Sequence, residues 1–317
     1  MSLIYNVTII DDQKEFYSDY KPIIEEILNT NGFAVHVSYI ASMEDFEQCI
    51  LRDQDLFMID LKFGQEDKGQ EFVKLIREKY FIDILFYSSD TNAIQNYRKD
   101  PKMQGIYFAE KDEQSGEVDA LLKRLLDKMI MKCNSPRSMR GIVMECVSEL
   151  DETIRAKCME LFQKVERDKH NVIYKKILQL YKKSNDGRNN SLREFFKVEF
   201  TKGDLACDEF ALQIQPFSIS ELVEDVTITD SNKNLKVLAL IYSAVYGKDD
   251  IYHKINSYID LLSKRNKLAH ITQEKEGDNY IFRNKKDPSK TYILTMEESL
   301  LLRKTILDLE NIFKEIK

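Results

Sequence analysis

Short apolar runs alternate with amphipathic stretches along the first 130 residues of the chain. Five of the runs are rich in β-branched and aromatic residues and end at polar positions, which is typical of strands. They cover residues 7–10, 34–40, 56–61, 84–87 and 105–109. Between them, residues 70–79 and 117–131 repeat apolar side chains every three or four positions, which indicates helices. This alternation predicts an α/β doubly wound domain with a five-stranded parallel sheet.

The spacing of apolar residues becomes mainly helical after residue 137. Residues 138–183 predict one long amphipathic helix or two stacked ones, residues 234–246 a buried helix, and residues 250–269 a helix that Asp249 or Asp250 can cap. Residues 279–282 and 290–294 indicate a small hairpin, and Thr295 with Glu298 forms a capping box that opens a final helix. Residues 191–232 give no clear pattern. We therefore predict a mainly α-helical C-terminal domain.

The domain boundary is expected near Pro136, because proline ends helices and favours linkers. This gives a first domain over residues 1–132, a linker over 133–137 and a helical domain over 138–317. A length of 317 residues suits two domains. The chain has no apolar run long enough to span a bilayer, no N-terminal signal peptide, and five scattered cysteines without Cys-x-x-Cys spacing. These features predict a cytoplasmic protein with free thiols and no membrane partner.

Charge is distributed unevenly between the two halves. The net charge of the whole chain is −7, but residues 1–136 carry 16 basic and 25 acidic side chains, whereas residues 137–317 carry 31 and 29. The acidic excess therefore belongs to the α/β half. The overall charge does not exclude RNA as a partner of the other half.

Chemically useful side chains stand where four of the predicted strands end. They are Asp11 and Asp12, Asp60, Ser88, and Lys111. Because the carboxyl ends of parallel strands meet at one edge of a doubly wound sheet, we expect these side chains to share one pocket. Clustered carboxylates repel one another unless a cation joins them, and a hard divalent ion with oxygen ligands suits them best. The pattern therefore predicts a Mg²⁺ site.

Residues 4–132 resemble the receiver domain of response regulators, on these residues and on the stretch GQEFVKLIRE after Asp60. The resemblance implies that Asp60 accepts a phosphoryl group from a sensor histidine kinase or a small phosphodonor. It also implies that Asp11, Asp12 and Asp60 hold Mg²⁺, with the backbone carbonyl of Lys62 as a further ligand. The expected chemistry is in-line attack by the Asp60 carboxylate on a metal-neutralised phosphoryl group.

The same resemblance assigns switch positions to Ser88, Phe108 and Lys111. Lys111 would pair with the acyl phosphate, while Ser88 and Phe108 would repack one face of the domain in response to the added charge. Asp112 stands where the family usually has a proline, and the segment 60–69 is one residue longer than usual. Two other interpretations stay open: a degenerate receiver that only mediates contacts, and an unrelated flavodoxin-like domain.

The helical half contains one compact polar cluster, Arg265-Asn266-Lys267-Leu268-Ala269-His270, at the end of a predicted helix. It resembles the signature of HEPN domains, which implies a metal-independent endoribonuclease with Arg265, Asn266 and His270 as catalytic residues. His270 would move the proton of the RNA 2′-hydroxyl or of the leaving group, and Arg265 would stabilise the charge of the transition state. DNA is disfavoured as a substrate because it lacks that hydroxyl.

Arg265 and His270 are five residues apart, so on one helix their Cβ atoms point about 140° apart. A tight site therefore requires the helix to end or two copies to meet, and HEPN ribonucleases form homodimers. In the other interpretation of the cluster, the cations simply end a surface helix, where its dipole favours them.

Together these patterns predict a response regulator whose phosphorylated receiver controls a HEPN-type endoribonuclease. The alternative is a non-catalytic adaptor whose helical domain binds a protein partner. A DNA-binding transcription factor is weakened by the absence of a recognition-helix motif and by the small charge of the helical half.

Overall fold

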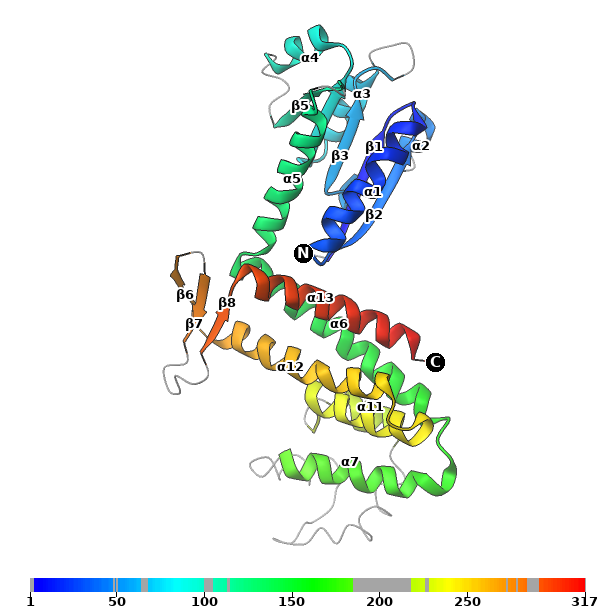
Figure 1. The fold of residues 1–317 in the computed structure, drawn as a ribbon. Helices are drawn as coiled ribbons and strands as arrows, with labels where there is room; N and C mark the ends of the chain where they lie inside the picture. The colour runs from blue at the N-terminus through cyan, green and yellow to red at the C-terminus, as the bar shows by residue number, and fades with distance from the viewer. Residues whose placement is uncertain are drawn as a thin grey trace. The chain divides into compact units, whose positions relative to one another are not determined.

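The computed structural model describes residues 3–47, 49, 51–63, 68–99, 105–112, 115–184, 218–225, 228–271, 273–277, 279–283 and 291–316 (Figure 1). The chain divides into two compact units. The first comprises Met1–Met139 together with Ser299–Lys304, and the second comprises Arg140–Glu298 together with Thr305–Lys317.

The first unit is built on a five-stranded sheet. Its strands are β1 (Ile4–Ile10), β2 (Ala34–Ile40), β3 (Leu56–Asp60), β4 (Asp83–Ser88) and β5 (Ile106–Glu110). All neighbouring pairs are parallel, and the order is β2-β1-β3-β4-β5. Every residue of the central strand β3 is buried. The predicted doubly wound parallel sheet is therefore confirmed.

Helices connect the strands of this sheet. They are α1 (Lys14–Thr30), α2 (Met43–Glu47), α3 (Gly69–Arg77), α4 (Thr91–Arg98) and α5 (Glu117–Cys133), with a short 3₁₀ turn, η1, at Leu51–Asp53. Side chains alternate along β4, so Phe86 packs in the core with α2, α3 and α4, whereas Tyr87 stacks on Phe16 of α1. Both faces of the sheet are thus covered, as parallel sheets require.

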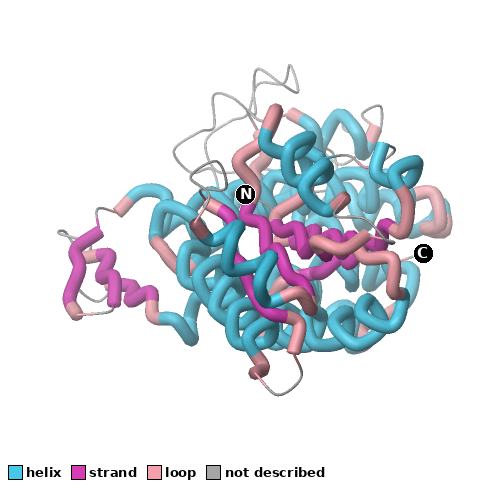
Figure 2. Tube along the Cα trace, turned by 90° about the horizontal axis from the view of Figure 1, so that it is seen from above, coloured by secondary structure: helices cyan, strands magenta, loops and turns pink. Residues whose placement is uncertain are grey.

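The second unit is mainly helical, which confirms the predicted fold class, and Figure 2 shows helices along most of the trace. It contains most of α6 (Pro136–Phe162), the 3₁₀ turn η3 (Arg167–Lys169), α7 (His170–Ser184), α10 (Ile219–Glu224), α11 (Ser231–Tyr246), α12 (Asp250–His270) and most of α13 (Met296–Glu315). Of the two possibilities predicted for residues 138–183, one long helix or two stacked helices, the structure shows two separate helices, α6 and α7. As predicted, Asp249 caps α12 through the Tyr252 N–H and Thr295 caps α13 through the Glu298 N–H, each at 3.0 Å. None of the helices that the structure describes is long and apolar enough to cross a membrane.

A three-stranded antiparallel sheet follows α12. Its strands β6 (Gln273–Glu276), β7 (Asn279–Phe282) and β8 (Tyr292–Leu294) pair in that order. The hairpin of β7 and β8 was predicted, although its turn lies outside the described residues. Strand β6 was not predicted, because its four residues are all polar and exposed and so carry no hydrophobic alternation.

The residues near the expected linker are largely helical. Helix α5 ends at Cys133 and α6 begins at Pro136. Proline is well suited to the first turn of a helix, where its missing N–H would have no intrahelical partner. The end of α5 therefore leads almost directly into α6.

The first unit is completed by a segment from the far end of the chain. Within this unit Arg303 is buried, and its guanidinium donates to the carbonyl oxygen of Asn31 at 2.9 Å and to Asn134 Oδ1 at 2.7 Å. The guanidinium also lies 4.7 Å from the centre of the Phe33 ring. Neutral oxygens and an aromatic face thus solvate a buried cation.

Candidate functional site

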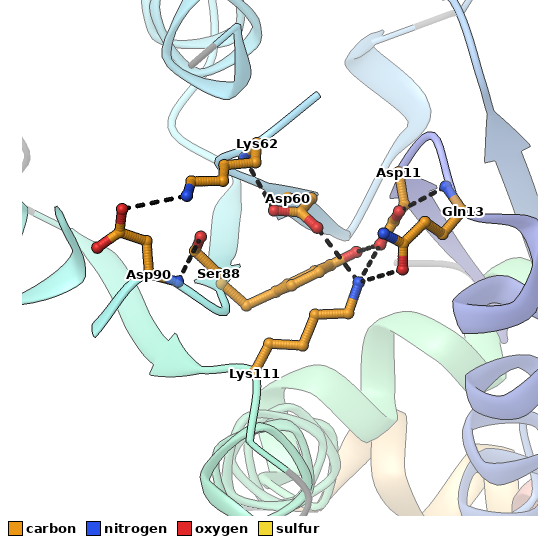
Figure 3. A network of polar contacts seen from close by, with 8 residues as sticks. Asp11, Gln13, Asp60, Lys62, Ser88, Asp90 and Lys111 are labelled. Atoms are coloured by element: carbon orange, nitrogen blue, oxygen red, sulfur yellow. Dashed lines mark hydrogen bonds and ion pairs between the residues drawn. The ribbon is translucent and has the colours of Figure 1, made fainter. Parts of the chain in front are cut away.

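The carboxyl ends of the parallel strands meet at one edge of the sheet. Backbone bonds hold these ends in register: the Leu61 N–H donates to the Tyr87 carbonyl at 2.8 Å, and the Lys111 N–H donates to the Ser88 carbonyl at 2.7 Å. The structure places four of the predicted side chains at this edge, Asp11, Asp60, Ser88 and Lys111 (Figure 3). We call the site formed by the buried carboxylates of Asp11 and Asp60 and the half-buried Lys111 the acidic pocket.

Lys111 lies between the two carboxylates of the acidic pocket. Its Nζ is 3.1 Å from Asp11 Oδ2 and 3.2 Å from Asp60 Oδ2, and it also contacts Gln13 Oε1 at 3.5 Å (Figure 3). The ammonium lies 4.5 Å from the centre of the Phe16 ring, a distance typical of a cation–π contact. One cation therefore serves two buried carboxylates, which leaves the pocket with an excess of negative charge.

The pKa of Asp60 is set mainly by its burial. Burial raises the pKa of Asp60 to about 6; the Lys111 ammonium opposes the rise, and the Asp11 carboxylate adds to it. The Lys62 N–H donates to Asp60 Oδ1 at 2.9 Å, so each carboxylate oxygen has a donor. Asp60 is mostly ionised at neutral pH, but in an environment that penalises its charge.

The third predicted carboxylate, Asp12, is exposed. In the part of the chain that the structure describes, no three His, Cys, Asp or Glu side chains form a group that could hold a metal ion. The Lys111 ammonium instead holds Asp11 and Asp60. The predicted three-carboxylate set is therefore only partly assembled.

The other two predicted switch residues, Ser88 and Phe108, lie on the neighbouring strands β4 and β5. Ser88 is fully buried, and its hydroxyl oxygen accepts from the Asp90 N–H at 3.1 Å. Asp90 in turn caps α4 through the Ala93 N–H at 3.0 Å and pairs with Lys62 Nζ at 3.1 Å (Figure 3). Phe108 is half-buried on β5 and meets Phe86 edge to face.

Sequence reasoning missed the role of Tyr87 in this pocket. Tyr87 is fully buried, and its hydroxyl donates to Asp11 Oδ2 at 2.8 Å. Burial raises the pKa of Tyr87 well above its ordinary value, so the phenol remains a donor at neutral pH. A tyrosine in an apolar strand is indistinguishable from a core aromatic residue by pattern alone, because only the structure shows where the hydroxyl ends.

Gly69, the first residue of α3, is required by its close approach to β3. A Cβ at this position would lie 2.2 Å from the Asp60 carbonyl oxygen and 2.7 Å from the Leu61 Cα. Both atoms belong to the backbone and cannot swing away. The close packing of the start of α3 against the end of β3, where Asp60 lies, therefore depends on glycine here.

We expect Gly69→Ala to lower the free energy of unfolding by about 1–3 kcal/mol, the usual cost of overpacking, as measured by chemical denaturation. The matched control is Gly141→Ala in α6, where an added Cβ meets nothing within 4 Å. That control should gain about 0.5–1 kcal/mol, because alanine favours a helix. Equal stabilities of the two variants would contradict the contact at Gly69.

The second predicted site lies on α12. Arg265 is half-buried and Asn266 is exposed, whereas the side chain of His270 lies outside the described residues. Arg265 lies near Asp151 of α6, whose pKa burial raises and the Arg265 charge lowers. The Nε of Arg265 and the Oδ1 of Asp151 are both buried without a hydrogen-bond partner. Arg265 is therefore not a purely solvated cation at a helix end.

Further cations surround the C-terminal end of α12. Lys264 pairs with Glu298 at 2.7 Å, and Lys267 Nζ lies 5.6 Å from the centre of the Tyr292 ring. From α6, Arg140 Nη2 donates at 3.1 Å to the carbonyl oxygen of Ile271, the residue that follows α12. The structure thus gathers basic side chains from two helices around the predicted motif.

Comparison with known proteins adds no relative. The chain matches no family model, and no curated protein is significantly similar to it. The class of the first unit is therefore assigned from its fold. A five-stranded parallel sheet in the order β2-β1-β3-β4-β5 defines a receiver-like α/β unit, which a helical region follows.

Proposed function

We propose that the α/β unit is a phosphorylation-responsive receiver domain in which Asp60 accepts the phosphoryl group. One observation carries this proposal: at the carboxyl ends of the strands, Asp11 and Asp60 converge on the single ammonium of Lys111. An Asp60 oxygen would attack the phosphorus atom, and the bond from phosphorus to the leaving group of the donor would break. The leaving group departs with its electron pair.

The residues of the acidic pocket suit Mg²⁺. Two buried carboxylates already share a cation, and burial leaves Asp60 with a raised pKa even beside Lys111. Asp11 and Asp60 would hold the ion, with Asp12 and the Lys62 carbonyl as further oxygen ligands. When bound, Mg²⁺ would neutralise phosphoryl oxygens and orient them for in-line attack.

Two side chains would then respond to the modified Asp60. Lys111, released from its present contact with the ionised carboxylate, would pair with the phosphoryl oxygens. Ser88 would give up its contact with the Asp90 N–H, and its hydroxyl would donate a hydrogen bond to a phosphoryl oxygen. Because Asp90 caps α4 and pairs with Lys62, this change would reach the start of α4.

The test is phosphorylation of the full chain by a small acyl phosphate, with the modified residue mapped by mass spectrometry. We expect a single phosphoryl group on Asp60 that hydroxylamine removes, as it does an acyl phosphate, and that forms with Mg²⁺ and not with a chelator. Modification of another residue would contradict the assignment of Asp60. No modification in the presence of Mg²⁺ would favour the degenerate receiver or the unrelated flavodoxin-like domain.

For the helical unit we propose a metal-independent endoribonuclease that acts as a homodimer, with Arg265, Asn266 and His270 in its site. The observation that favours this function is the unpartnered Arg265 Nε–H within a group of cations from α6 and α12. The RNA 2′-oxygen would attack the adjacent phosphorus atom and the 5′-oxygen would leave. His270 would take the proton from the first or supply it to the second.

The alternative output is a non-catalytic adaptor whose helical unit binds a protein. An RNA cleavage assay distinguishes the ribonuclease from the adaptor. The full chain is incubated with RNA in the presence of a chelator, before and after phosphorylation, at protein concentrations where it is dimeric. Cleavage to products with a cyclic phosphate would support the ribonuclease, and phosphorylation is expected to change its rate. Intact RNA in both states would leave the adaptor as the better proposal.

A further inference from the structure

Both oxygens of the Asp11 carboxylate are held by donors in the acidic pocket. The Gln13 N–H donates to Oδ1 at 2.8 Å. Oδ2 accepts from the Tyr87 hydroxyl at 2.8 Å and from Lys111 Nζ at 3.1 Å. Asp11 is fully buried, so these donors replace water around its charge. The neutral phenol of Tyr87 and the cation of Lys111 therefore share one oxygen.

The ring of Tyr87 is itself fixed by other rings. Phe16 stacks on it with ring centres 4.3 Å apart and planes 20° apart, and Tyr20 stacks on Phe16 at 4.2 Å. We call these three rings, Tyr87, Phe16 and Tyr20, the aromatic column. At the other end of the column, the Tyr20 hydroxyl donates to Asp119 Oδ1 of α5 at 2.6 Å. The stacking leaves the Tyr87 hydroxyl little freedom to leave Asp11.

The aromatic column also lies beside Lys111. The Lys111 ammonium is 4.5 Å from the centre of the Phe16 ring and 5.4 Å from that of Tyr87. When Lys111 leaves Asp11, the Tyr87 hydroxyl and the Gln13 N–H can still hold the carboxylate in place. Tyr87 would thus keep Asp11 oriented at the moment when its ammonium partner is replaced.

We propose that Tyr87 is a positioning residue of the acidic pocket, which holds Asp11 in the orientation needed to bind a divalent cation. The inference rests on the proposed function in one respect, namely that Asp11 is a ligand of the cation. Tyr87 is paired with Asp60 on the neighbouring strand. Its hydroxyl, however, donates to Asp11 and not to Asp60 or to the phosphoryl group in this scheme, so it acts through Asp11. Hydrogen-bond partners of metal ligands typically contribute a factor of about 10–100 to metal affinity.

The test compares Mg²⁺ binding by the full wild-type chain and by Tyr87→Phe, measured by isothermal titration calorimetry. Phenylalanine keeps the ring and its stacking and removes only the hydroxyl. We expect the dissociation constant for Mg²⁺ to rise about tenfold. At saturating Mg²⁺, the rate of phosphorylation by a small acyl phosphate should return to within about threefold of wild type, because the hydroxyl does not touch the reacting atoms.

The matched control is Tyr20→Phe, which removes a hydroxyl from the other end of the same column. It should bind Mg²⁺ as the wild type does. A second variant, Phe16→Leu, keeps the phenol but removes its stacking, and should weaken Mg²⁺ binding in the same direction by a smaller factor. This variant keeps the inference testable if Tyr87→Phe does not fold.

The possible outcomes separate the inference from the proposed function. Unchanged Mg²⁺ affinity in Tyr87→Phe, with only a lower unfolding temperature, would show a structural role and overturn the inference alone. Equal weakening in Tyr87→Phe and Tyr20→Phe would also overturn it, because the effect would not be specific to Asp11. A wild-type chain that binds no Mg²⁺ would overturn both.

Discussion

Replacing Asp60 with Asn should abolish phosphorylation by a small acyl phosphate and, at the same time, stabilise the protein. The first effect follows because an amide is not a nucleophile. The second follows because burial raises the pKa of Asp60 from 3.8 to about 6, so its negative charge destabilises the folded state. At about 1.4 kcal/mol per pKa unit, we expect the free energy of unfolding to rise by about 2–3 kcal/mol at pH 8 in a chelator.

The pH dependence of this gain has a definite sign. Between pH 4 and pH 6 the folded chain holds a proton on Asp60 that the unfolded chain has lost, so wild-type stability falls as the pH rises through this window. Asparagine does not titrate and escapes this loss. The advantage of Asp60→Asn should therefore be absent below about pH 4 and complete above about pH 6, as measured by denaturant unfolding at each pH.

The matched control is Asp55→Asn, which makes the same substitution next to the opposite end of β3. It should leave phosphorylation intact. Mg²⁺ should narrow the stability difference between the wild type and Asp60→Asn, because a bound cation stabilises the ionised carboxylate. Persistent labelling of Asp60→Asn would mean that the acceptor is misassigned, and a pH-independent loss of stability would contradict the electrostatics of the pocket.

Replacing His270 with Ala should reduce RNA cleavage by the full chain by a factor of about 100 or more, the usual contribution of general acid–base catalysis. Binding of RNA should change much less, since the neighbouring cations remain. The measurement is the single-turnover rate of cleavage, with enzyme in excess, in the presence of a chelator.

The control for this variant is His253→Ala, which removes an exposed histidine from the same helix α12. It should cleave RNA at the wild-type rate. If both histidine variants are equally active, His270 is not catalytic. If only Arg265→Ala loses activity, the site uses the α12 cations without a histidine.

The parallel sheet was predictable because its strands are nearly continuous apolar runs that end in polar residues. Hydrophobic periodicity also placed α11, α12 and the start of α13, with the caps at Asp249 and Thr295. Strand β6 was not accessible to this reasoning, because Gln273–Glu276 pairs through its backbone while all four side chains stay in solvent.

The acidic pocket, too, was predictable in part from the sequence. Strand ends predicted that Asp11, Asp60 and Lys111 would meet, because topology alone brings them together. The sequence could not show that the ammonium of Lys111 lies between the carboxylates, or that Tyr87 donates to Asp11, since both depend on side-chain reach. The neighbourhood of Arg265 and Asp151 was likewise hidden, because the two residues belong to different helices.

The burial of Arg303 has a consequence for how the protein is made. The α/β unit needs Asn31, Phe33 and Asn134, and also the segment Ser299–Lys304, which follows them in the chain only after most of the helical unit has been synthesised. Domains generally fold as units while the chain emerges, N-terminal first. Here the α/β unit must wait until the segment Arg140–Glu298 and then Ser299–Lys304 have left the ribosome before the buried side chain of Arg303 is in place. A chain whose translation stops before Ser299 would therefore carry an incomplete receiver-like unit.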